Sequence, residues 1–561
     1  MSFQKIKERT SEPKKCDINK STLLFYLLVS IIYYFPILFR STLPHFPPQD
    51  TYFHLNRILS LDSVFVSPIS FSAFGHHGTM VNMCYPWLTI YPAWLIFRIT
   101  HRLLISYKTY QIFLTFLTLC SAHYVMQSIA KCRSTSQIFS MIYTFSLYRF
   151  ANVFRRQALG EIIAMVFLPI IILGLYNIII SENKRWFTLA IGMTGLMYTH
   201  FLSAFLSFFV IIIVFLINLP FMNSIFIRLK ALIKSGVIAF LLSLASVISL
   251  ITSAPDLFFP KGNTETLTAS AFPISQRIIM SLTNQPVSYS LGLTILLAIP
   301  TTVFLIIYSL IKNKMIQNKN KFVFAGSIFI TGLLTTLIST SVFPWRIVTG
   351  NPFLAIQFAW RLNALSTVMI SFSLCFFFKK CAYCKPLSHH IMLPILCIGL
   401  LTIHYHCLYN LRIVEHNSIT EEAIVTGNHY HIDYTPVKAV GSIGWDWSNY
   451  YLNINGSQIA AETILRKSYY IVYFENPFPG ESVMEVPVFW FPHLTVTIDG
   501  KPLRASCSDN GLVLLTIPSG YHTVNLHYSY SISARCSQFI SLLTVIILFG
   551  QYYRKKITGY S

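Results

Sequence analysis

Long apolar runs separated by short polar and basic segments recur along most of the 561-residue chain. Many of these runs reach about 18 residues, which is enough for a helix to cross a lipid bilayer. The pattern therefore predicts a polytopic α-helical membrane protein with about twelve spans. The predicted spans lie at 21–39, 109–130, 137–147, 162–180, 186–199, 201–219, 235–253, 290–311, 322–342, 362–378, 391–409 and 538–552.

Two apolar stretches need a different interpretation. The stretch from Tyr85 to Trp94 is short and rich in proline and aromatic residues. Such residues favour the headgroup region of a membrane, so we interpret this stretch as an interfacial or re-entrant helix. The stretch 186–220 is too long for one crossing, and we divide it at His200 into two spans.

A polar region with a different periodicity separates the last two predicted spans. Within it, the segments 494–498, 511–517 and 524–528 alternate apolar and polar residues, and the turn sequences Asp499-Gly500 and Pro518-Ser519-Gly520 separate them. This pattern predicts antiparallel strands. The predicted organisation is a basic tail at 1–20, a transmembrane domain at 21–410 with its first outer loop at 40–108, a β-rich domain at 411–534, and a last helix with its tail at 535–561.

Composition and charge add an orientation to this picture. The chain is 54% hydrophobic and only 11% charged, yet its net charge is +22. The lysines and arginines collect in the short segments between spans, where cytoplasmic loops carry such an excess. We therefore expect both termini in the cytoplasm and the β-rich domain outside, and we attribute the positive charge to membrane topology rather than to nucleic-acid binding.

The first outer loop begins with an unusual group of polar residues. Asp50, His54 and Arg57 follow the first span within a few residues. If a helix begins at Thr51, Asp50 occupies its N-cap position, and His54 and Arg57 project from one side of it. One interpretation is a capped interfacial helix whose arginine reaches lipid headgroups. The other is a catalytic carboxylate beside cations that hold a lipid-linked phosphate.

Further polar residues are predicted on the same membrane face. Taken singly, each arginine could snorkel to headgroups, and the histidine could pair between helices. Together they suit a transferase: a carboxylate deprotonates the acceptor or binds a divalent metal, and arginines stabilise the departing phosphate. These residues are Arg155, Arg156, Glu161, His200, Arg346 and Arg361.

The segment from Gln49 to Arg57 resembles the G-x-D-x-x-F-H-x-x-R stretch of YfhO-like bacterial membrane proteins, a group related to the 6-pyruvoyl-tetrahydropterin synthase-related membrane proteins. Later segments resemble the landmarks of that group in the same order. They are Tyr85-Pro86 to Tyr91-Pro92, Arg156 to Glu161 with Leu168-Pro169, Tyr198 to His200, Gln357 to Arg361, Asp433 to Pro436, and the outer strands through Asp499 to Lys501 and Gly511-Leu512.

This resemblance implies a GT-C-like glycosyltransferase in a bacterial cell membrane. Such an enzyme would move a sugar from a polyprenyl-phosphate carrier to an envelope polymer or glycolipid on the outer face. By this analogy Asp50 is the base or a metal ligand. From the predicted clustering on the outer face, the candidate catalytic residues are Asp50 and Glu161, and the candidate substrate-binding residues are His54, Arg57, Arg155, Arg156, His200, Arg346 and Arg361. Asp50 is also the candidate ligand for a divalent metal, and no cofactor is certain from the sequence.

The sequence departs from the family pattern in two ways. Gln49 stands where the family has glycine, and Asp50 is not part of a D-x-D motif, so the sequence gives no separate support for a metal. The pterin-related name implies no pterin chemistry, because no histidine triad of a soluble synthase is present.

Two other classes of function remain open at this stage. A transporter or flippase of lipid-linked intermediates could use the same arginines, but it should show internal repeats and charged residues at mid-membrane depth. A non-catalytic envelope assembly protein could use the β-rich domain to bind a polymer.

The cysteines suggest two additional sites. Cys381 and Cys384, followed by His389 and His390, have the spacing of a zinc site, although a solvated turn in a basic loop explains them as well. Cys507 and Cys536 could pair outside the cell, but nothing in the sequence requires it.

Overall fold

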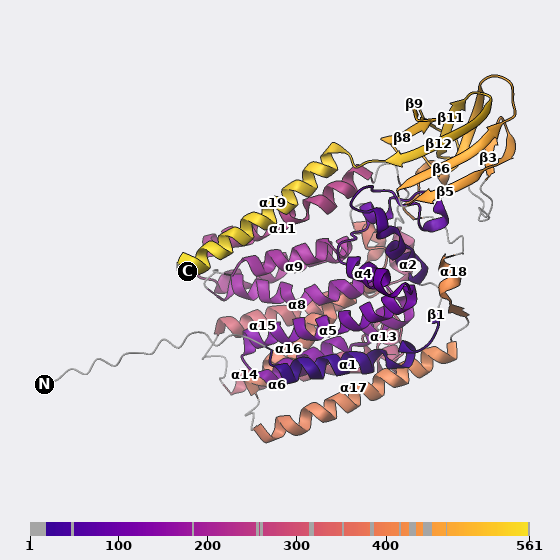
Figure 1. Ribbon diagram of the computed structural model, residues 1–561. Coiled ribbons are helices and arrows are strands. Elements are labelled where there is room, and N and C mark those ends of the chain that lie inside the picture. The colour runs from indigo at the N-terminus through magenta and orange to yellow at the C-terminus, as the bar shows by residue number, and fades with distance from the viewer. Residues whose placement is uncertain are drawn as a thin grey trace.

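A computed structural model shows a bundle of long helices with a β-rich domain at one end (Figure 1). It describes residues 18–45, 50–181, 185–253, 257, 262–312, 319–350, 353–381, 386–414, 417–425, 433–440, 451–466 and 468–558. In these residues ten helices are long and apolar enough to cross a membrane. They are α1 (Lys20–Leu38), α5 (Leu103–Ala130), α8 (Leu159–Ile179), α10 (Phe201–Asn218), α11 (Ile225–Ser253), α14 (Gly292–Ile311), α15 (Lys319–Ile338), α16 (Asn363–Cys381), α17 (Pro386–Val414) and α19 (Ile532–Thr558).

The other two predicted spans are short helices. α6 (Arg133–Thr144) has 12 residues and α9 (Phe187–Met197) has 11. At 1.5 Å per residue each is much shorter than a hydrocarbon core of about 30 Å. α6 is extended by α7 (Leu147–Phe150) and a π-helical turn, η3 (Ala151–Arg156), which brings the chain to the end of the bundle where Asp50 lies. The structure confirms a multi-pass helical membrane protein.

The short apolar stretch after the first outer loop does not cross the bundle. It forms α3 (Val81–Cys84) and the ten-residue α4 (Tyr91–Thr100). Before α4, the Thr89 hydroxyl donates to the carbonyl of Tyr198 at 2.8 Å. After α4, the amide of Leu103 donates to Glu421 at 2.7 Å. Both contacts lie at the end of the bundle that carries the β-rich domain, in agreement with the predicted interfacial helix.

The β-rich domain is a sandwich of two five-stranded antiparallel sheets, ordered β10-β11-β7-β3-β4 and β5-β6-β12-β8-β9. The three strands predicted from sequence are β8, β11 and β12. All ten strands lie within 451–528, inside the predicted range. They are β3 (Tyr451–Ile454), β4 (Ser457–Ala460), β5 (Glu462–Arg466), β6 (Tyr469–Asn476), β7 (Ser482–Phe489), β8 (Leu494–Ile498), β9 (Lys501–Leu503), β10 (Ser506–Cys507), β11 (Leu512–Ile517) and β12 (Gly520–Tyr528).

Turn chemistry and side-chain alternation account for this sandwich. Asp499 and Gly500 both have positive φ, at 48° and 77°, and Ile498 pairs with Lys501 across them. Positive φ at both central residues is the geometry of a type I′ hairpin turn. Alternate residues of β6, such as Val472, and of β7, such as Val486, are fully buried. These inward-facing residues form the core between the sheets.

The sandwich is attached to the first outer loop by side-chain and backbone contacts. The Tyr530 hydroxyl, just before α19, donates to the carbonyl of Val64. His77 Nδ1 lies 2.8 Å from the carbonyl of Pro487, and the amide of Phe489 donates to the carbonyl of His77 at 2.8 Å. A small two-stranded sheet also joins β1 (Leu43–His45) to β2 (Asn417–Ile419). The domain is therefore docked on the helical end that carries Asp50.

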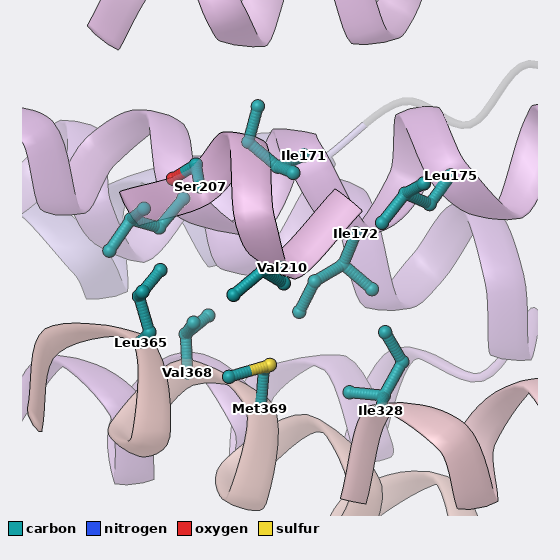
Figure 2. Close-up of a pocket in the computed structure, with 10 residues that line it drawn as sticks. Ile171, Ile172, Leu175, Ser207, Val210, Ile328, Leu365, Val368 and Met369 are labelled. Atoms are coloured by element: carbon teal, nitrogen blue, oxygen red, sulfur yellow. The ribbon is translucent and has the colours of Figure 1, made fainter. Parts of the chain in front are cut away.

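A small apolar cavity lies in the bundle interior between α8, α10, α15 and α16 (Figure 2). Its volume is about 10 Å³, and Ser207 supplies the one hydroxyl in a lining of aliphatic residues and Met369. A buried water normally makes about three hydrogen bonds. This cavity therefore suits neither water nor a substrate.

The two cysteine predictions have different outcomes. Cys384 lies outside the described residues, so the zinc prediction stays a prediction. Cys507 and Cys536 are both free thiols, so the optional disulfide is not formed.

Candidate active site

The site begins with a tight turn between η3 and α8. Gln157 ends η3 in the left-handed conformation, with φ 54°, and the amide of Ala158 donates to the carbonyl of Asn152 at 3.0 Å. α8 then starts at Leu159 and carries Glu161 in its first turn. The reversal brings Arg156 Nη1 within 3.0 Å of Glu161 Oε1. Two residues that the sequence places five apart thus face each other as an ion pair.

Glu161 is buried and both of its carboxylate oxygens are engaged. Tyr148 donates to Oε2 at 2.6 Å, and Asn152 donates to the same oxygen at 3.3 Å. Arg156 donates to Oε1, and Arg361 Nε lies 3.4 Å from that oxygen without the alignment of a hydrogen bond. The side chain is only 5% exposed. Buried charges are tolerated when they are paired and hydrogen-bonded in this way.

Two arginines share this one carboxylate. Arg156 also donates to Asn152 Oδ1 at 2.8 Å, and its guanidinium lies 4.3 Å from the centre of the Trp360 ring. Burial favours the neutral form of Arg156, but the negative charges of Glu161 and Asp50 outweigh burial and raise its pKa. Arg156 is therefore a permanent cation.

Arg361 reaches the site from a distant part of the chain. It lies in η9 (Ala359–Leu362), immediately before α16. Its Nη1 donates to Gln357 Oε1 at 2.6 Å and to the carbonyl of Ile356 at 3.3 Å. Gln357 has a positive φ of 59°, which turns the chain before η9. The side chain of Arg361 is 14% exposed, so it still has contact with solvent.

Asp50 is the exposed carboxylate of the site. It stands at the predicted N-cap position of α2 (Thr51–Leu59), but its side chain makes no capping hydrogen bond, in contrast to the expected cap. Its amide donates to the carbonyl of Arg156 at 2.9 Å, and its Oδ2 lies 3.9 Å from Arg156 Nη2. The side chain is 48% exposed. The carboxylate is thus held beside Arg156 and open to a ligand.

His54 and Arg57 lie on the buried side of α2. Arg57 donates to the carbonyls of Tyr85 at 3.1 Å and Pro86 at 2.7 Å, and its Nη1 lies 3.4 Å from His54 Nδ1. The guanidinium also stacks on the Tyr85 ring, 4.1 Å from its centre. Burial lowers the pKa of Arg57 to about 10. These contacts hold α2 against the segment after α3, and the predicted substrate role of both residues stays a prediction.

Tyr85 connects this buried layer to the Glu161 turn. Its hydroxyl lies against Gly160, where a Cβ would overlap it. The ring of His200 lies 6.1 Å from the Tyr85 ring, and His200 Nδ1 lies 2.9 Å from Ser203 Oγ. Burial lowers the pKa of His200 to about 4, against a smaller opposite effect of Glu161. The imidazole of His200, which lies beside the site, is therefore uncharged near neutral pH.

Two of the predicted outward arginines, Arg155 and Arg346, do not join this cluster, and neither does the nearby Arg149. Arg155 donates to the carbonyl of Pro286 at 3.2 Å, and Arg346 is exposed at η7 (Trp345–Ile347). Arg149 is fully buried over the Tyr33 ring, 5.4 Å from its centre. The predicted roles of Arg155 and Arg346 in substrate binding stay predictions.

Sequence reasoning missed four residues that shape the site: Tyr148, Asn152, Gln357 and Trp360. A signal for two of them was present, because Tyr148, Asn152 and Arg156 are spaced four apart and share a helix face. The positions of Gln357 and Trp360 depend on how α16, which follows η9, packs against α8, and no periodicity in the sequence predicts that packing.

The described carboxylates do not form a complete set of protein ligands for a metal ion. In the described part of the chain, no group of three or more His, Cys, Asp or Glu side chains is placed to hold a metal ion. Glu161 is engaged by two arginines, and Asp50 is the exposed carboxylate. A divalent ion at Asp50 would thus take its remaining ligands from water and substrate phosphates, as Mg²⁺ commonly does.

Comparison with known proteins finds similarity to solved structures and none to family models or curated proteins. No family model matches the chain, and no curated protein matches it. A cryo-EM structure of arabinofuranosyltransferase AftD from Mycobacteria aligns with a TM-score of 0.46 and 13% identity over 72% of this chain. A mutant of the same enzyme aligns with a TM-score of 0.43 and 13% identity over 70% of this chain. In both cases the alignment covers 28% of the AftD chain. The resemblance to YfhO-like proteins stays a prediction.

Proposed function

We propose that this protein is a membrane glycosyltransferase of the cell envelope. It would transfer a sugar from a polyprenyl-phosphate carrier to an envelope polymer or glycolipid on the outer face. The observation that carries the proposal is the cluster in which Asp50, half exposed, stands beside Arg156, while the buried Glu161 holds both Arg156 and Arg361. A reactive carboxylate beside a fixed pair of cations matches the needs of transfer from a phosphate leaving group.

In the proposed reaction Asp50 removes the proton from the acceptor hydroxyl. The oxygen then attacks the anomeric carbon of the donor sugar, a glycosidic bond forms, and the bond between that carbon and the phosphate oxygen breaks. The phosphate leaves with the bonding electron pair. Arg156 and Arg361 stabilise the charge that develops on it, because guanidinium groups bind phosphate through paired donors. The lipid phosphate would have to approach from the membrane surface, where the cluster lies at the end of α8 and α16.

We infer a different role for Glu161. Four side chains already surround its carboxylate, so it has no free oxygen to act as a base. It neutralises one of the two positive charges and fixes the orientation of both arginines. Glu161 is therefore a positioning residue in this proposal, and Asp50 is the reacting carboxylate.

The test is complementation of a deletion strain, read out by the sugar composition of its envelope polymers and glycolipids. We expect a missing sugar substituent in the deletion strain, restored by the wild-type protein and not by Asp50→Asn. Loss of a general base typically costs ~10²–10⁴-fold in rate. Because Asp50 makes no capping bond, the substitution should change stability by less than the ~1 kcal/mol of a lost cap.

The matched control is Asp62→Asn in the same outer loop. Asp62 accepts a hydrogen bond from Ser72 at 2.7 Å, away from the arginine pair. This variant should restore the modification, and membrane abundance is measured for both variants. If Asp50→Asn is present at normal abundance and restores the modification fully, the proposed chemistry is wrong. A deletion strain whose lipid-linked intermediates are only redistributed across the membrane would favour a transporter.

A further inference from the structure

The guanidinium of Arg156 lies against an aromatic face to which the proposed reaction assigns no role. Its central carbon is 4.3 Å from the centre of the Trp360 ring, well within the ~6 Å at which a cation is attracted to an aromatic face. Trp360 is only 9% exposed. Tryptophan makes the strongest contact of this kind, and the attraction increases where water is excluded. One face of this arginine is therefore held by a largely buried indole.

The indole is itself held in place by the segment that leads into α16. The Phe358 ring stacks on it, with 5.0 Å between the ring centres and 14° between the ring planes. The amide of Ala359, which lies between these two residues, donates to Ser270 Oγ at 2.8 Å. Ring stacking and a buried hydrogen bond both stabilise the position of η9. Trp360 thus provides a fixed surface for the long side chain of Arg156.

Two hydrogen bonds orient Arg156 within its plane. Nη1 donates to Glu161 Oε1 at 3.0 Å and to Asn152 Oδ1 at 2.8 Å. Nε and Nη2 lie along one edge of the guanidinium and donate no hydrogen bond to a described residue, and Nη2 is 3.9 Å from Asp50 Oδ2. The side chain of Arg156 is 13% exposed, so solvent reaches it. An edge with two adjacent N–H groups is the part of a guanidinium that binds two phosphate oxygens at once.

We infer that Trp360 is a positioning residue for the phosphate of the lipid-linked donor. The indole fixes the plane of Arg156, and the contacts at Nη1 fix its rotation in that plane. The Nε–Nη2 edge is then held beside Asp50, on the exposed side of the site. Without the ring, the guanidinium would keep its contacts at Nη1 but could tilt out of this plane. Trp360 touches no reacting atom and acts only through Arg156.

This inference rests on the proposed function for the identity of the donor, but binding of a polyprenyl phosphate can be measured without transfer. The test is equilibrium binding of radiolabelled undecaprenyl phosphate to the full-length protein in detergent micelles. Undecaprenol, which has the same chain without the phosphate, is the second probe. Trp360→Phe keeps an aromatic ring, whereas Trp360→Leu and Trp360→Met keep an apolar side chain without one.

We expect both ring-free variants to raise the Kd for undecaprenyl phosphate by roughly 5- to 30-fold, as for loss of a cation–π contact at a partly desolvated arginine. The Kd of Trp360→Phe should lie between those of the wild type and the ring-free variants. The Kd for undecaprenol should be the same in all of them, because the indole does not act on the chain.

A double-mutant cycle tests whether Trp360 acts through Arg156. Arg156→Gln removes the guanidinium and should by itself weaken binding of undecaprenyl phosphate. In that background Trp360→Leu should have no further effect on the Kd, because the group that it positions is absent. A tryptophan that only fills space would give the same loss in both backgrounds.

The matched control is Trp345→Leu in η7. Trp345 is also buried, at 3% exposed, but its indole donates to the carbonyl of Ile338 at 2.9 Å, away from the arginine pair. This variant should lower the thermal unfolding midpoint and leave the Kd for both probes unchanged. The midpoint is measured for every variant, so that loss of folding is recognised.

Three results would overturn the inference: an unchanged Kd in a folded ring-free variant, equal losses for both probes, or an undiminished loss in the Arg156→Gln background. Failure of the wild type to bind undecaprenyl phosphate would overturn it as well. The proposed transferase function has a separate readout in the envelope sugars. If the deletion strain lacks no sugar while the binding results hold, the phosphate site stands and the transferase function is wrong.

Discussion

Asp50 and Glu161 are both carboxylates at the same end of the bundle, but their surroundings differ. Glu161 is buried under two arginines, a tyrosine and an asparagine, whereas the side chain of Asp50 is 48% exposed with its nearest cation 3.9 Å away. A carboxylate whose two oxygens already contact several donors fixes the orientation of those donors. One that is held loosely beside a cation can accept a proton from a substrate. The division of roles therefore follows from contacts and exposure, since the residue types are alike.

The role of the arginine pair can be tested by comparing Arg361, which belongs to the cluster, with Arg346, which does not. Arg361→Ala should weaken use of the lipid-phosphate donor by ~10-fold or more, because a charge-assisted hydrogen bond contributes about 1.5–3 kcal/mol. Arg346→Ala, which removes an exposed arginine outside the cluster, should have a smaller effect. The measurement is donor dependence of transfer in membranes, normalised to protein abundance. Equal effects of both variants would indicate that Arg361 only contacts headgroups.

His200 predicts a dependence of stability on pH. Its pKa is about 4 in the folded protein, lowered by burial, against about 6.5 in an unfolded chain. Between these values the unfolded chain binds the proton and the folded protein does not. The contribution of His200 to the free energy of unfolding is therefore fully present above pH 6.5. It decreases toward pH 4 by up to about 1.4 kcal/mol per pH unit.

The measurement is the thermal unfolding midpoint of the detergent-solubilised protein between pH 7 and pH 4. His200→Gln should show a smaller decrease than the wild type over this interval. Burial also lowers the pKa of His77 to about 4, but His77 is present in both proteins and cancels in the comparison. Parallel curves for the two proteins would contradict the prediction.

Among the elements, the junction between η3 and α8 packs closely against Tyr85. α8 begins immediately beside Tyr85, and its Gly160 has no room for a Cβ. Tyr85 cannot easily retreat, because its ring is buried against the guanidinium of Arg57. The absence of a side chain at position 160 thus permits the close approach that places Glu161 under the arginines.

Gly160→Ala should therefore displace either Tyr85 or the first turn of α8. Overpacking of this kind typically costs about 1–3 kcal/mol, and a shift of Glu161 would disturb both arginines. We expect lower transfer activity together with a lower unfolding midpoint. The matched control is Gly326→Ala, at a glycine of α15 with open space around it. It should change neither the transfer activity nor the unfolding midpoint. Normal activity of Gly160→Ala would show that the turn tolerates rearrangement.

At the scale of the whole molecule, the sandwich and the carboxylate cluster share one end of the bundle, and α19 runs from the sandwich to the opposite end (Figure 1). α1 leads from that opposite end toward β1. The chain therefore has its first and last membrane helices oriented in opposite directions. We therefore predict that Lys20 and Arg554 lie on one side of a membrane and the sandwich on the other.

The excess of lysine and arginine predicts which side is the cytoplasm. A cysteine introduced as Asp509→Cys on the exposed sandwich surface should react with a membrane-impermeant maleimide in intact cells. A cysteine introduced as Arg554→Cys should react only after the membrane is permeabilised. Both variants carry Cys507→Ser and Cys536→Ser, which remove the free thiols near the probe sites. The reverse labelling pattern would place the cluster in the cytoplasm and exclude an outer-face reaction.

The sequence by itself determined where most helices and several strands lie. The length of an apolar run sets whether a helix can cross the bilayer, and this property is local to the run. The hairpin at Asp499-Gly500 is equally local, because the two positive φ angles depend on the turn residues themselves. The division at His200 and the non-crossing segment before α5 could be predicted for the same reason.

Only the tertiary structure decided which polar residues form one site. Asp50, His54 and Arg57 are neighbours in sequence, yet the first faces solvent and the other two are buried among carbonyls and rings. Arg361, from a far part of the chain, reaches Glu161 because η9 leads into α16, which packs against α8. Hydrophobic periodicity specifies which face of a helix is buried. It does not specify which other helix covers that face or how far along the axis the two are aligned, and those two choices set every distance in the cluster.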